Sequence, residues 1–225
     1  MKGFRVGERR AAAGGPAAMV TFLLAACCWP LASATIDRIA ALVDRQVLTV
    51  SEISQMEQIR FFSRAAKQSD DDYRREILDD LVAQALRYRD VERFGATDVS
   101  KDAIEARLVQ IQKRFTSIDD FNAALQQAEL TLDELRALIK RELQVENYIQ
   151  ERFAPMIVVS TDEIESYYKG AWTQQRRQRG LAVPPLADVQ EDIRTTLKSS
   201  RLQQEVDKWT TELRSRANVD VYTWR

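Results

Sequence analysis

The chain offers few side chains that could catalyse a reaction. It contains no histidine, which excludes a Ser-His-Asp or Cys-His nucleophile and a histidine-ligated zinc ion. Its only two cysteines, Cys27 and Cys28, lie side by side in an apolar N-terminal run. The acidic residues are abundant, but none stands in an apolar context that would suggest a general acid. We therefore expect a protein that is not an enzyme and has no metal site and no cofactor.

Side chains that could act by binding are easier to find. Apolar aromatic rings and flexible thioethers suit the capture of other polypeptides, and arginines attract acidic chains or anionic lipid head groups. Three groups stand out: an N-terminal binding group (Met56, Phe61 and Phe62), the junction aromatics (Tyr167, Tyr168 and Trp172), and a basic run from Arg176 to Arg179.

Each group also has a plain structural interpretation. Phe61 lies off the helical stripe of Ile53, Met56 and Ile59 and next to Phe62, so both rings cannot face one core. One ring is then core and the other either contacts a bound chain or is simply exposed. The junction aromatics either form a wall for a bound chain or pack against the last helix. The basic run is either a binding patch or a solvated stretch of polar linker.

The first 34 residues have the pattern of a secretory signal peptide. A basic start with Lys2 and Arg5 precedes an apolar run over 17–29, and Ala32-Ser33-Ala34 matches a small-residue cleavage site. The apolar run is too short for a membrane span, which takes ~20 residues. We expect export and a mature protein that begins at Thr35.

A second interpretation of the N-terminus stays open. Leu24-Ala25-Ala26-Cys27 resembles a lipobox, which would make Cys27 a lipidated N-terminal residue. With either N-terminus the exported chain has no disulfide and must rely on packing. Its net charge stays mildly negative, which argues against a nucleic-acid partner.

The rest of the chain is patterned as helices between short β segments. Residues 36–43 and 47–48 predict a hairpin, and the alternation over 219–222 predicts a strand that pairs with it. Capping boxes begin helices at Thr49 and two later positions. The expected helices cover 49–62, 69–94, 100–115, 117–128, 131–153, 160–170 and 186–213.

Two features of the second half are unusual. The helix that begins at Ser160 should close at Gly170, and Pro184-Pro185 precedes the last helix. In that last helix the apolar stripe steps five residues from Leu197 to Leu202. The step predicts either a bend or different packing partners for the two halves.

The order of these segments resembles that of SurA-type periplasmic chaperones. The opening hairpin with the Ser51-Glu52 helix start is similar to the beginning of the mature family members. Further similar stretches are Leu78–Leu86, Phe153–Pro155, Val158–Tyr168 and Leu197–Tyr222. Each of these motifs is weak by itself, but their order is fairly specific. The resemblance covers essentially the whole mature chain.

The resemblance implies a mainly α fold: a multi-helix module like the SurA N-terminal domain, with a small β element formed by the N-terminal hairpin and the C-terminal strand. It divides the chain into the signal peptide (1–34), a helical chaperone module (35–170), a short linker (171–185), and a C-terminal helix and strand that pack back on the module (186–225). In the family, parvulin-type prolyl isomerase domains sit at the position of this linker. A linker this short, together with the absent histidines, makes isomerase activity unexpected.

The function that the resemblance implies is that of an ATP-independent periplasmic holdase. Such a protein would bind unfolded exported or outer-membrane protein precursors through an apolar groove, with the N-terminal binding group and the junction aromatics as candidate contacts. It would need no small-molecule substrate. The alternative is a non-catalytic adaptor or structural envelope protein that binds one folded partner, with Cys27 as a lipid anchor; a prolyl isomerase is a weaker third. A homodimer formed by helix exchange stays open.

Overall fold

The structure, a computed structural model, describes residues 37–95 and 98–222. The predicted signal peptide, its cleavage site and Cys27 lie outside the described residues. Their assignment therefore stays a prediction.

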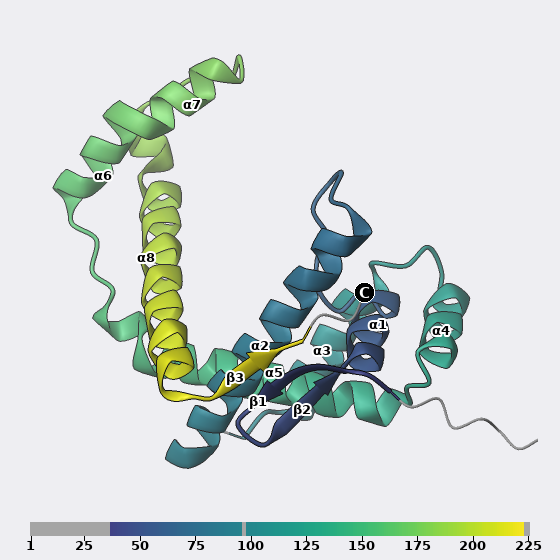
Figure 1. The fold of residues 1–225 in the computed structure, drawn as a ribbon. Helices are drawn as coiled ribbons and strands as arrows, with labels where there is room; N and C mark the ends of the chain where they lie inside the picture. The colour runs from purple at the N-terminus through teal and green to yellow at the C-terminus, as the bar shows by residue number, and fades with distance from the viewer. Residues whose placement is uncertain (1–36, 96–97, 223–225) are drawn as a thin grey trace, which may run out of the picture. The chain divides into compact units, whose positions relative to one another are not determined.

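The two ends of the described chain meet in one small sheet (Figure 1). Strands β1 (Ile39–Val43) and β2 (Gln46–Thr49) form the hairpin, and β3 (Val219–Val221) pairs with β1 in the antiparallel order β2-β1-β3. The hairpin turn is tied to the chain before β3, because the Asp44 amide donates to the Asn218 carbonyl at 2.7 Å and the Asn218 amide donates to Asp44 Oδ1 at 2.8 Å. The predicted pairing of the C-terminal strand with the hairpin is confirmed.

Helices make up most of the remainder, so the mainly α prediction is confirmed. Serine or threonine side chains cap six of the described helix starts, and the capping boxes predicted by sequence pattern form at Thr49, Thr131 and Ser160. The helices are α1 (Val50–Gln58), α2 (Asp70–Phe94), α3 (Lys101–Gln112), α4 (Ile118–Gln127), α5 (Leu132–Arg152), α6 (Thr161–Tyr167), α7 (Thr173–Gln178) and α8 (Leu186–Arg216).

Helix α1 is shorter than predicted. It ends at Gln58, because Arg60 takes a left-handed conformation (φ 51°) and the Phe61 amide donates back to the Met56 carbonyl at 3.0 Å. This is the Schellman arrangement that ends helices. The prediction that Phe62 lies on the first helix is therefore wrong; Phe61 and Phe62 begin the loop to α2.

The prediction that Gly170 closes its helix is also wrong. The chain passes through a π-helical segment, η2 (Tyr168–Trp172), kinks at Gly170 and continues as α7. Helix α7 ends at Gln178, and Gly180 follows its C-cap with a φ of 67°, which suits a residue without a side chain. Part of the stretch expected as linker is thus helical.

The described residues build two hydrophobic clusters. The main core joins the sheet to α1–α5, and the second cluster surrounds Val159, Ile164 and Ile193. Helix α8 has 31 residues, about 46 Å at 1.5 Å per residue, and serves both clusters. Leu197 packs on the second cluster and Leu202 on the main core. The step in its apolar stripe therefore reflects two packing partners along an unbroken helix.

A matched pair of truncations tests this division. Ile193 and Ile77 are both fully buried, one in each cluster. Ile193→Ala should cost about 2–5 kcal/mol and remove hydrogen-exchange protection from α6 while α2 stays protected, whereas Ile77→Ala should lower protection in α2. Equal loss across both regions in the Ile193→Ala variant would show that the clusters unfold as one.

Candidate functional site

A groove of about 740 Å³ opens beside the tip of the β1–β2 hairpin. Its walls come from the hairpin, α2, α5 and the first turn of α1, which are distant in sequence. We call it the hairpin groove; its lining residues are Val43, Asp44, Arg45, Gln46, Leu48, Glu52, Leu81, Gln84, Ala85, Tyr88, Arg89, Glu92, Leu138 and Arg141.

The floor of the hairpin groove is apolar. Leu81, Ala85 and Tyr88 follow one another at helical spacing on α2, and Leu138 contributes from α5. All four are half-buried: they pack on the main core with one side and leave the other to the groove. Helical periodicity alone does not reveal this floor. Ile77, Leu78 and Val82 on the same apolar stripe of α2 are buried, whereas the three floor residues pack on the core with only part of their surface.

The rim of the groove is charged but balanced. Arg89 pairs with Asp44, and the Arg141 guanidinium lies 5.6 Å from the centre of the Tyr88 ring. Burial raises the pKa of Tyr88, and the neighbouring Glu92 raises it further, so the phenol keeps its proton and can donate a hydrogen bond. Three arginines face three carboxylates around the rim, so the groove does not select a ligand of one charge.

Strand β2 forms one wall and lies at the edge of the sheet. Within the described residues no strand pairs with its outer side, and Val47 on this strand is 44% exposed. An edge strand offers unpaired amides and carbonyls to an extended chain. The groove therefore combines apolar contacts with main-chain hydrogen-bonding capacity. Neither kind of contact is highly selective for the sequence of the bound chain.

The N-terminal binding group lies elsewhere. Met56 and Phe61 are 4% and 6% exposed and belong to the main core. Phe62 is half-buried, meets Phe61 edge to face with ring centres 5.3 Å apart, and lines a second hollow of about 490 Å³ with Tyr73. Of this group, only Phe62 presents part of its ring to a hollow.

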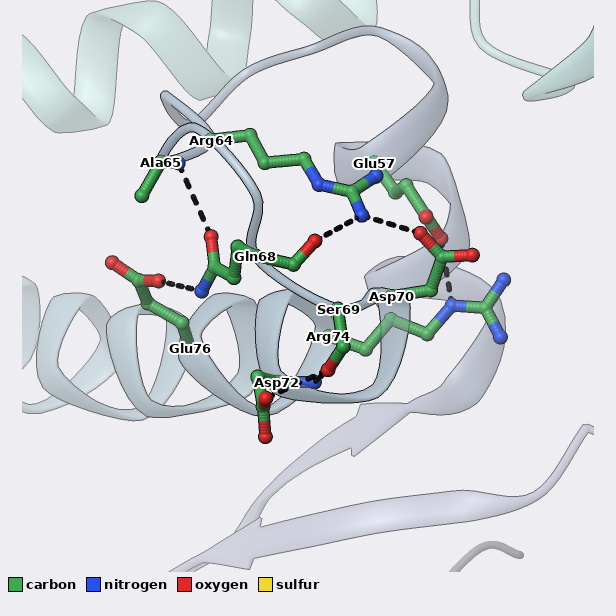
Figure 2. Close-up of polar contacts among 9 residues, drawn as sticks. All are labelled: Glu57, Arg64, Ala65, Gln68, Ser69, Asp70, Asp72, Arg74 and Glu76. Carbon is green, nitrogen blue, oxygen red and sulfur yellow. Dashed lines mark hydrogen bonds and ion pairs between the residues drawn. The ribbon is translucent and has the colours of Figure 1, made fainter.

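The loop that carries Phe62 is held by polar contacts, which Figure 2 shows in part. Arg64 donates to the Gln68 carbonyl at 2.7 Å and pairs with Asp70, while the Gln68 amide group reaches Glu76. The other residues that line this hollow are charged or polar (Glu57, Arg60, Ser63, Arg64 and Arg114). The hollow is smaller than the hairpin groove.

The neighbouring arginines act as structural clamps. Arg114 donates to the carbonyls of Arg60 and Phe61 at 2.5 Å, and Arg60 donates to the Arg114 carbonyl. These carbonyls follow the C-terminal ends of α1 and α3, where positive charge is favoured. Both arginines therefore have a structural role, because their guanidinium groups hydrogen-bond the carbonyls that follow these helix ends.

The junction aromatics pack against the second cluster. Tyr168 and Trp172 stack with ring centres 5.4 Å apart, and the Tyr168 hydroxyl donates to the Pro184 carbonyl at 2.7 Å. Tyr167 borders an open, shallow hollow of about 400 Å³ with Ala171. All three rings are half-buried, and none lines the hairpin groove.

Cations from α8 hold the segment that leads into α6. Arg194 donates to the Val159 carbonyl at 3.3 Å, and Arg201 bonds both the Val158 carbonyl and the Glu163 carboxylate. These contacts lower the pKa of Glu163 to about 2. The largest cause is the hydrogen bond from Arg201, followed by the hydrogen bonds from Ser160. The capping carboxylate of α6 is thus also its link to α8.

Comparison with known proteins supports the resemblance seen in the sequence. No family model matches the chain. Proteins named Chaperone SurA match it: that of Pseudomonas putida is 26% identical over 70% of the chain, that of Methylococcus capsulatus 24% over 82%, and that of Alkalilimnicola ehrlichii 28% over 66%. The resemblance to the SurA-type chaperones is confirmed.

These SurA relatives are longer than this chain. The matched regions cover 39%, 43% and 35% of the three relatives, respectively.

Within the described residues no helix has the length and apolar character to cross a bilayer, and no cluster of three or more acidic residues is arranged to bind a metal ion. What the SurA-like chain does therefore has to be proposed from its grooves and surfaces.

The Glu163 link predicts a pH response. Because folding lowers the pKa of Glu163 from 4.5 to about 2, its contribution to stability is complete above pH ~5 and is lost as the pH falls toward 2. Carbon-detected NMR should find the side chain titrating near 2, and Arg201→Gln should move the pKa part of the way back. Titration at the ordinary value in the wild-type protein would contradict the link.

Proposed function

We propose that this protein is an ATP-independent chaperone that holds unfolded polypeptides in the hairpin groove. It would act in the periplasm on exported proteins, outer-membrane precursors among them. It captures an extended segment by laying apolar side chains on the floor formed by Leu81, Ala85, Tyr88 and Leu138, with the main chain along β2.

The observation that carries this proposal is the makeup of the groove. An open hollow of about 740 Å³ is too large for one side chain and has a half-buried apolar floor, a charged rim and an edge strand as one wall. Binding by apolar area and main-chain hydrogen bonds tolerates many sequences. Weak selectivity of this kind is what a holdase requires.

The relatives add support at the level of the family. Each is named a chaperone, and the match to the Methylococcus capsulatus protein covers 82% of this chain. Release without a nucleotide follows from the nature of the contacts, since each apolar side chain contributes only about 1.5–3 kcal/mol and the segment must lose conformational freedom on binding.

We further propose that the protein holds its clients without isomerising their proline bonds. The only residues between Gly170 and Pro184 complete η2 and form α7 and a short loop, and the sequence has no histidine. A protease-coupled proline-peptide assay should show no acceleration above the uncatalysed rate. Substantial acceleration would overturn this part of the proposal.

The first test is the aggregation of a urea-denatured outer-membrane β-barrel protein after dilution. The purified protein should suppress light scattering at a few-fold molar excess and without ATP. No suppression at any ratio would overturn the proposed activity. If the protein does not suppress aggregation but captures a single folded partner in a pull-down, an adaptor role is favoured.

A pair of arginine substitutions locates the activity. Ala85→Arg adds a long charged side chain to the groove floor between Leu81 and Tyr88 and should raise the concentration needed for half-suppression by about tenfold, equivalent to ~1.4 kcal/mol. Ala137→Arg adds the same side chain to an exposed position of α5. It should change the concentration needed for half-suppression by less than twofold. Circular dichroism melting of both variants checks the fold. Equal effects of the two folded variants would place the client outside the groove.

A further inference from the structure

The end of α7 carries a concentration of positive charge in an otherwise acidic protein. From Gly170 to Ala187 the sequence contains Arg176, Arg177 and Arg179 and no acidic residue. The whole chain has 33 basic and 34 acidic residues, so these three arginines leave the rest of the chain with a net charge of −4. We call α7 and the loop to Pro184 the basic tip.

The loop of the basic tip is fixed in place by its own contacts. The Leu181 amide donates to the Arg176 carbonyl at 2.9 Å, and the Gly180 amide donates to the Arg177 carbonyl at 3.0 Å. Arg176 itself donates from Nε to the Ala182 carbonyl at 2.7 Å and lies 4.9 Å from the centre of the Trp172 ring. The tip is therefore a defined surface and not a loose polar linker.

Two of its arginines have no such internal role. Arg177 and Arg179 are exposed, and across the described residues neither forms an ion pair. The nearest acidic residue before the tip, Glu165, is already paired with Lys169 at 2.9 Å. Leu181, between these cations and the proline pair, is 48% exposed. The tip thus presents unneutralised guanidinium groups beside an apolar side chain.

We propose that the basic tip docks the protein on a membrane surface that contains anionic phospholipid. Guanidinium groups bind phosphate oxygens in bidentate fashion, and the exposed Leu181 can enter the head-group region. The contact is peripheral and reversible. It is independent of the hairpin groove and does not rest on chaperone activity.

A lipid surface fits the tip better than an acidic polypeptide does. The hollow that borders the tip is shallow and open, lined by Tyr167, Ala171 and three glutamines, and gives an extended chain no groove to follow. A bilayer needs no such groove, because its phosphates are spread over a plane. Each cation near an anionic surface is worth about a fivefold change in partition, so three give roughly a 100-fold preference over neutral lipid.

The test is co-sedimentation of the purified protein with vesicles. Phosphatidylcholine vesicles with 30% phosphatidylglycerol are compared with pure phosphatidylcholine at low and at high salt. The wild-type protein should bind the anionic vesicles preferentially at low salt and lose that preference in high salt, where the charges are screened. The double variant Arg177→Gln/Arg179→Gln should bind roughly 25-fold more weakly, because two cations are lost.

A matched control removes two other exposed cations. Lys198→Gln/Lys208→Gln on α8 lowers the net charge by the same amount and should bind within about twofold of wild type. All three proteins share the same N-terminus, so its basic and apolar residues cancel in the comparison. Equal binding by the two double variants, or equal binding of wild type to neutral and anionic vesicles, would overturn the proposal. Arginine-dependent binding of soluble poly-glutamate with no binding to vesicles would overturn it in favour of an acidic polypeptide.

Discussion

The pairing of β3 with β1 is the interaction on which the rest of the structure depends. It joins residues 219–221 to residues 41–43 and makes β1 the central strand, with Ala40 and Ala41 fully buried. Asp44 strengthens the closure, since it exchanges hydrogen bonds with Asn218 and pairs with Arg89 on α2. The same residue lines the hairpin groove. Closing the chain and shaping the groove therefore share one residue: without the C-terminal segment the hairpin tip would lose its hydrogen bonds to Asn218 and keep its ion pair with α2.

Much of the fold follows from local patterns in the sequence. The capping boxes at Thr49, Thr131 and Ser160, the hairpin and the C-terminal strand depend on residues close to one another in the chain or on simple alternation. The misplaced boundaries have a different physical basis. At Arg60 a left-handed residue with a side chain ends α1, where a glycine would have signalled the stop. At Gly170 a glycine that usually ends a helix only bends it.

The candidate site was much less predictable than the fold. Helical periodicity shows which face of α2 is apolar, but it does not show how much of that face the other elements cover. Coverage of Leu81, Ala85 and Tyr88 depends on the hairpin and on α5, each tens of residues away in sequence. The aromatic residues that attract attention in the sequence were poorer guides, because Phe61 and the Tyr168–Trp172 pair are used mainly for packing. The floor residues look ordinary in sequence, and only their incomplete burial sets them apart.

Site-specific photo-crosslinking tests most directly whether the hairpin groove holds the client. A photoreactive phenylalanine analogue would replace Tyr88 in the groove or Val109, which is 45% exposed on α3 and does not line it. On addition of a urea-denatured outer-membrane protein, the account predicts strong crosslinks from position 88 and weak ones from position 109. Equal crosslinking from the two positions, or stronger crosslinking from position 109, would contradict it.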